Sequence, residues 1–270
     1  MKENTKQLTF CYLLFLLMLA LVGYLEGVIS DFLYYAAFLV PSALALHLSR
    51  GRRGDGEEKL YLGLKLDGAK LLSVLISPTV FAVWGLSYLT ALLIYVTTGA
   101  TDTVDVGSSF PLAVITTALV PALCEELLFR YLPMRLIAPY SRARAVWLSA
   151  VFFAVAHLSP FSLVYALVAG VIFMVADIAA ESIWPSVILH FINNFVNLIM
   201  IFYPSVEVKI GVIVSLCLLF AITLPIFILN RRKIISAIKS AFDKGEQAEL
   251  DPTPLLFIIP AVVVGASLLF

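Results

Sequence analysis

The segment "FPLAVITTALVPALCEELLFRYLPMRLIA" (residues 110–138) decides the fold, because it is long and apolar yet carries charged side chains near its centre. About 20 apolar residues are enough to cross a bilayer as a helix. Glu125, Glu126 and Arg130 lie within this run. On insertion scales each charge at that depth costs at least ~2.5–3.5 kcal/mol. These three charges must therefore either neutralise one another or serve a function.

The composition of the chain indicates a membrane protein. Hydrophobic residues make up 61% of the sequence and charged residues 13%, and the mean hydropathy is +1.01. A soluble domain averages about 45–50% apolar and about 25% charged residues. The net charge is zero, which gives no argument for a nucleic-acid partner. The cysteines form no C-x-x-C pair, so we expect packing residues at Cys11, Cys124 and Cys217.

Repeated apolar runs predict the number of helices. They predict an all-α, polytopic membrane helix bundle of eight to nine transmembrane helices, with residues 1–270 forming a single integral membrane domain. The fifth run is short, and the last has no polar flank at its far end. The nine runs are 8–29, 32–48, 71–97, 110–138, 144–158, 161–180, 182–203, 210–230 and 254–270.

Clusters of basic residues predict the orientation. They occur at 50–59, at Arg142 and Arg144, and at 230–244. Alternating spans bring these clusters to the same side, which the positive-inside rule makes cytoplasmic. We therefore expect a multi-pass protein of the cell membrane whose site is accessible from the cytoplasm. The stretch 231–244 is predicted to be either an amphipathic interfacial helix or a solvated linker.

The two glutamates in the long run have different surroundings. Glu126 and Arg130 are four residues apart, so they share one helix face and can form an ion pair. Glu125 lies about 100° around the helix from Glu126. No basic residue stands three or four positions from Glu125. The sequence thus predicts one paired and one unpaired carboxylate.

Two later runs carry histidines with a partner four residues away. Phe153 and His157 form the first pair, and His190 and Asn194 form the second. Counting ~1.5 Å per residue from the ends of the runs places both histidines at depths that overlap with Glu125. An isolated histidine or asparagine in a span is commonly a helix–helix hydrogen bond. The occurrence of three such motifs on three successive spans favours a site.

Other polar and proline residues have simpler interpretations. Asn193 and Asn197 lack a partner at the right offset, so we expect ordinary interhelical contacts there. Proline removes a backbone N–H and leaves a carbonyl that something polar must satisfy. This permits a water-filled cavity, although an ordinary kinked helix is an equal alternative. The prolines concerned are Pro121, Pro133 and Pro185.

These motifs resemble a known family. Glu125–Glu126 with Arg130, Phe153 with His157, and His190 with Asn194 look like the three motifs of the CAAX-protease and bacteriocin-processing (CPBP) family, which includes the type II CAAX prenyl endopeptidases. The resemblance covers about 110–200, and the catalytic core is expected at about 110–203. Members commonly have about eight spans, so a ninth helix departs from the pattern.

The resemblance implies a role for each matching residue. Glu125 and His157 would activate a water molecule, Arg130 would hold Glu126, and His190 with Asn194 would stabilise the oxyanion. This metal-free form is favoured because no H-E-x-x-H helix is present and zinc would consume the base. The alternative is a zinc-dependent form of the same protease with Glu125, His157 and His190 as ligands.

The predicted function is therefore an intramembrane endopeptidase that hydrolyses a peptide bond of a membrane-anchored protein or peptide. Prenylated CAAX tails, sorting-signal tails and leader peptides would all suit such a site. The alternative from another class is a bacteriocin-immunity or membrane interaction protein without proteolysis. A transporter is less favoured, because the polar groups gather at one level and no internal repeat is visible.

Overall fold

The computed structural model describes residues 2–22, 28–49, 63, 66–101, 107 and 109–245. Within these ranges every regular element is helical. A helical fold is expected in lipid, since a helix satisfies its own backbone hydrogen bonds where water is absent. The last apolar run, 254–270, and the basic cluster at 50–59 lie outside the described residues.

From Phe110 to Ala241 the helices follow one another with short connections. The five elements between residues 110 and 136 form one uninterrupted helix, which we call the motif helix. In chain order the elements are α1 (Lys2–Val22), α2 (Val28–Ser49), α3 (Leu66–Thr98), α4 (Phe110–Ala113), the π-helix η1 (Val114–Leu119), α5 (Val120–Glu126), the π-helix η2 (Leu127–Tyr131), α6 (Leu132–Leu136), α7 (Arg142–Ala156), α8 (Pro160–Ala180), α9 (Trp184–Phe202) and α10 (Val206–Ala241).

Six helices in the described part are long and apolar enough to cross a membrane: α1, α3, the motif helix, α8, α9 and α10. In α2 the apolar stretch Leu33–His47 is shorter. The expected span at 144–158 is corrected to α7, which has 15 residues. At 1.5 Å per residue α7 is about 22 Å long, less than the ~30 Å hydrocarbon core. The prediction of a multi-pass helical membrane protein is confirmed, whereas eight to nine spans are not.

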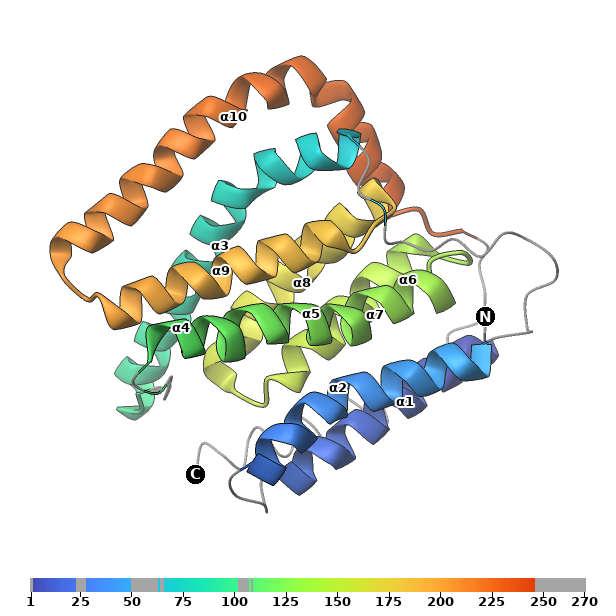
Figure 1. The fold of residues 1–270 in the computed structure, drawn as a ribbon. Helices are drawn as coiled ribbons and strands as arrows, with labels where there is room; N and C mark the ends of the chain where they lie inside the picture. Colours follow the sequence, from blue (N-terminus) through green and yellow to red (C-terminus); the bar gives the residue numbers. More distant parts are fainter. Residues whose placement is uncertain are drawn as a thin grey trace.

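The motif helix runs through the middle of the molecule (Figure 1). Helix α9 packs along one side of it, and the α1–α2 hairpin packs along the other. An aromatic cluster joins the hairpin to the motif helix: Tyr12 stacks on Phe129 with ring centroids 5.5 Å apart, and Phe15 meets Phe129 edge-on at 5.6 Å. Helices α3 and α10 lie beyond α9.

Helices α7 and α8 cross at very short range. A Cβ atom built on Gly170 of α8 would lie 2.8 Å from the Ala150 Cα of α7. Only glycine fits such an approach, since real Cβ atoms do not come so close to a backbone. Small residues at helix crossings are typical of membrane proteins, where close backbone packing replaces the hydrophobic driving force. This crossing fixes α7, the helix whose C-cap residue is His157.

Large apolar side chains remain exposed along the outer helices. Val96 of α3 is 72% exposed and Leu229 of α10 is 84% exposed. A soluble protein rarely exposes apolar surface this extensively. These faces are therefore the lipid contacts of an integral membrane protein.

One side of the bundle brings together the start of α1, the start of α7 and the end of α10, and it carries several basic residues. The Ala143 N–H donates to the Asp243 carbonyl over 3.0 Å, which joins the start of α7 to the end of α10. The Asn4 side-chain amide donates to the Leu136 carbonyl over 2.9 Å, which brings the start of α1 to the same place. Helix α10 contains Pro225 and bends before its last basic turns (Figure 1). The predicted helix at 231–244 is thus the end of α10, with Ile234 buried against α3.

Candidate active site

Two prolines shape the motif helix. Pro121 cannot donate to the Thr117 carbonyl, and Pro133 cannot donate to the Phe129 carbonyl, four residues earlier. Asn194 Nδ2 donates to the first carbonyl over 3.1 Å, and Ser149 Oγ donates to the second over 2.6 Å. Side chains of α9 and α7 thus supply the partners that the sequence required. These contacts also lock both helices to the motif helix.

The predicted ion pair is present. Arg130 Nε lies 3.2 Å from Glu126 Oε2, and both side chains are completely buried. The other carboxylate oxygen, Glu126 Oε1, lies 2.8 Å from His190 Nδ1. An ionised carboxylate can only accept, so the His190 Nδ1 carries the hydrogen. Glu126 therefore couples the motif helix to α9 and sets the orientation of the His190 ring.

Arg130 is also held by aromatic rings. Its guanidinium carbon lies 4.3 Å from the Phe153 ring centre and 5.5 Å from the Phe173 ring centre. Its Nη1 and Nη2 atoms have no hydrogen-bond partner in the described part of the chain. Cation–π attraction strengthens when the cation is desolvated, so these rings stabilise a charge that water does not reach. This contact explains the phenylalanine of the F-x-x-x-H motif.

Glu125 differs from its neighbour as predicted. It is half-buried, and it makes neither an ion pair nor a hydrogen bond with any residue that the structure describes. Its carboxylate borders two cavities. A carboxylate that is free of protein partners and open to a cavity can take a proton from a bound water molecule.

His157 stands at the C-terminal end of α7. Its Nδ1 lies 2.7 Å from the Phe153 carbonyl oxygen, which can only accept a hydrogen bond. The Nδ1 atom therefore carries the hydrogen, and in the neutral ring Nε2 keeps a free lone pair. Because α7 is short, its end reaches the level of Glu125, where His157 borders the same two cavities.

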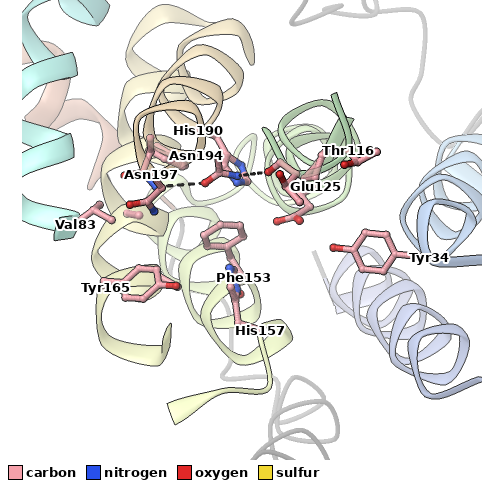
Figure 2. Close-up of a pocket in the computed structure, with 16 residues that line it drawn as sticks. Tyr34, Val83, Thr116, Glu125, Phe153, His157, Tyr165, His190, Asn194 and Asn197 are labelled. Atoms are coloured by element: carbon pink, nitrogen blue, oxygen red, sulfur yellow. Dashed lines mark hydrogen bonds between the residues drawn. The ribbon is translucent and has the colours of Figure 1, made fainter. Parts of the chain in front are cut away.

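His190 and Asn194 face the cavity from α9, opposite Glu125 (Figure 2). Asn194 uses one N–H for the Thr117 carbonyl, and its amide nitrogen keeps a second N–H. The Asn193 amide lies 3.4 Å from Asn194 Oδ1, which leaves the Asn194 nitrogen on the side of the motif helix. Two groups on one rigid helix thus point toward the space beside Glu125.

Two cavities meet at this place. One, of ≈ 410 Å³, is lined by the polar groups of α9 and the motif helix. The other, of ≈ 450 Å³, is lined mainly by apolar side chains of α1, α2 and α7. Of the residues that the structure describes, three border both cavities: Tyr34, Glu125 and His157. The junction therefore combines a carboxylate, an imidazole and a phenol.

Some lining residues were not foreseen. Asn193 and Asn197 were expected to be ordinary interhelical residues, yet both line the polar cavity. The spacing of His190, Asn194 and Asn197 (i, i+4, i+7) is one helix face and could have predicted Asn197. Tyr34 precedes the first motif by 91 residues, and no local pattern points to it.

A further buried carboxylate supports α9 from α8. Asp177 is completely buried, and its Oδ1 accepts the Ser186 backbone N–H over 2.8 Å. This N–H belongs to the first turn of α9, whose donors have no partner within the helix. Asp177 thus fixes the start of the helix that carries His190.

Whether the site fits a metal ion depends on whether its potential ligand side chains come together. Glu125, His157 and His190 are the residues that a zinc site would use. Within the described ranges no three His, Cys, Asp or Glu side chains come together in a way that could hold a metal ion. The arrangement therefore does not fit a three-ligand zinc site, and we derive no step through a metal.

Comparison with known proteins identifies the region that carries these residues. Residues 107–196 match the family described as type II CAAX prenyl endopeptidase Rce1-like. The match covers 90 of the 270 residues, and we call this stretch the CAAX protease region. No curated protein and no solved structure gives a match. The CAAX protease region contains all seven residues that the resemblance singled out, and its match supports a CAAX-protease-like intramembrane endopeptidase at the level of the family.

Proposed function

We propose that the chain hydrolyses a peptide bond of a membrane-anchored protein or peptide with a water molecule activated by Glu125 and His157. The observation that carries this proposal is the contrast between the two glutamates. Glu126 is committed to Arg130 and His190, whereas Glu125 has no partner among the described residues and borders both cavities. We retain residues 110–203 as the catalytic core.

In this mechanism the Glu125 carboxylate takes one proton as the water oxygen attacks the scissile carbonyl carbon. His157 orients the same water molecule through Nε2, because its Nδ1–H is engaged by the Phe153 carbonyl. Preorganised donors near a developing oxyanion lower the barrier most where water is excluded. Asn194 supplies one such donor through its second N–H. A protonated His190, held at Nδ1 by Glu126, supplies another through Nε2.

Replacing Glu125 tests this assignment. Glu125→Gln keeps the shape of the side chain but removes the base, and a general base contributes about 10²–10⁴-fold. We expect the purified variant to cleave at least ~100-fold more slowly than wild type with an unchanged melting temperature. The probes are a fluorogenic farnesylated CAAX peptide, its unprenylated form and a leader-type peptide.

Glu207→Gln is the matched control, since Glu207 lies in the exposed first turn of α10. It should cleave at the wild-type rate. Dialysis against a strong chelator should leave wild-type cleavage intact. Loss of cleavage on chelation that zinc alone restores would favour the zinc-dependent form instead. A wild-type protein that cleaves none of the probes, or an active Glu125→Gln, would contradict the proposed function.

A further inference from the structure

The junction between the two cavities contains a residue from outside the CAAX protease region. Tyr34 belongs to α2, and the family match begins at residue 107. Helix α2 packs against the motif helix, and this contact brings the Tyr34 ring beside Glu125. Among the described residues that line the cavities, only Tyr34, Glu125 and His157 border both.

The position of the Tyr34 ring is fixed by neighbours on its own helix. Its centroid lies 5.3 Å from that of Tyr35 and 5.4 Å from that of Phe38, both in edge-to-face geometry. The hydroxyl end of the ring is turned toward Glu125 (Figure 2). Aromatic packing of this kind stabilises one orientation of the ring.

The Tyr34 hydroxyl is a donor that has no acceptor within the described part of the chain. It makes no hydrogen bond to any residue that the structure describes. It borders the same two cavities as the Glu125 side chain. Two polar groups that face each other without direct contact are commonly bridged by water. The junction can therefore hold a water molecule between the phenol and the carboxylate.

The hydrogen-bonding capacity of such a water molecule matches the three residues. Its two hydrogens can be donated to the Glu125 carboxylate and to the His157 Nε2 lone pair. Both of these partners are acceptors, so neither can occupy a lone pair of the water oxygen. The Tyr34 O–H is the donor that can. The remaining lone pair is then directed away from all three groups.

We propose that Tyr34 donates a hydrogen bond to the hydrolytic water molecule and so directs its free lone pair at the scissile carbonyl. This inference rests on the proposed function of Glu125 and His157. In the step the water oxygen bonds to the carbonyl carbon, and one water proton passes to Glu125. The carbonyl π electrons move to the oxyanion, and Tyr34 keeps its own proton throughout.

Removing the hydroxyl while keeping the ring tests the proposal. For Tyr34→Phe we expect kcat for the farnesylated CAAX peptide to fall about five- to tenfold with KM unchanged, because one neutral hydrogen bond acts on the attacking water. Tyr35→Phe makes the same chemical change one residue along, where the hydroxyl donates to the Thr116 carbonyl. That control should keep the wild-type kcat. Both variants should purify as folded monodisperse protein, since their rings are retained.

A double variant separates this inference from the proposed function. If Tyr34 and Glu125 act on the same water molecule, Glu125→Gln/Tyr34→Phe should retain the residual rate of Glu125→Gln alone. An inactive Glu125→Gln beside a Tyr34→Phe with wild-type kcat would overturn the Tyr34 assignment only. So would additive losses in the double variant, or a rise in KM at unchanged kcat. A fully active Glu125→Gln would instead overturn the proposed function.

Discussion

Glu126 and Arg130 show how a buried charge pair serves a neighbouring side chain. Neither side chain has any exposed surface, and Glu126 also holds His190 at 2.8 Å. Removing one member of a buried pair leaves an uncompensated charge and typically costs about 3–5 kcal/mol. The pair therefore contributes to stability and to the orientation of the His190 ring at once.

A single and a double substitution distinguish these two contributions. Glu126→Gln should lower the melting temperature markedly, because Arg130 loses its counter-charge while it stays buried. Adding Arg130→Met should recover much of that loss, since a thioether fits between the Phe153 and Phe173 rings. Neither variant should recover cleavage, because the ionised anchor of His190 is absent in both. Wild-type thermal stability of Glu126→Gln would contradict this account.

The same residues show what the sequence could predict about the site. The Glu126–Arg130 pair follows from spacing alone, because both partners lie on one helix and are four residues apart. The contact of Glu126 with His190 does not, since it depends on how α9 is rotated against the motif helix. Tyr34 was missed for the same reason, because its contact with the site depends on how α2 packs.

At the scale of elements, the close crossing of α7 and α8 controls where His157 lies. A Cβ at position 170 would meet the Ala150 backbone at 2.8 Å, so the helices must separate to accept it. Overpacking of this kind typically costs about 1–3 kcal/mol. Because His157 directly follows α7 as its C-cap residue, the separation also displaces the imidazole from Glu125.

We therefore expect Gly170→Ala to reduce both the melting temperature and kcat. Gly85→Ala in α3 is the matched control, because a Cβ there meets nothing within 4 Å. In a helix interior that change is neutral or stabilises by up to about 1 kcal/mol. Thermal melts of both variants in one detergent provide the measurement. Equal melting temperatures would show that the crossing can relax without cost.

The sequence could predict that the long helices exist, but it could not predict their exact bounds or their π-helical stretches. Apolar runs identify the long helices because a bilayer demands ~20 apolar residues per span. They displaced α7 by two residues, since the apolar run covers 144–158 whereas the helix runs from Arg142 to Ala156. They also gave no sign of η1 and η2, which arise where the chain accommodates Pro121 and Pro133.

For the whole molecule, the orientation in the membrane remains a prediction that one helix can test. The two ends of α10 are chemically different: Glu207 lies in its first turn, and Arg231 and Arg232 lie beyond its bend. The positive-inside bias places the second end in the cytoplasm. The contact of Ala143 with Asp243 places Arg142 and Arg144 on that same side.

Cysteine labelling of intact cells tests this orientation. In a chain with Cys11, Cys124 and Cys217 replaced, a membrane-impermeant thiol reagent should label Glu207→Cys. It should label Arg232→Cys only after the cells are permeabilised. The reverse pattern would place the basic side outside the cell and would contradict the cytoplasmic access that we propose for the site.

The two π-helical stretches also determine where the motif helix tolerates insertions and deletions. A π turn closes its hydrogen bonds one residue later than an α turn, so it accommodates one extra residue locally. A one-residue length difference within 114–119 or 127–131 can therefore be absorbed without turning the glutamates. The same difference within 120–126 would rotate Glu125 by about 100°. An alignment of relatives should accordingly place single-residue gaps in η1 or η2, and never between Pro121 and Glu126.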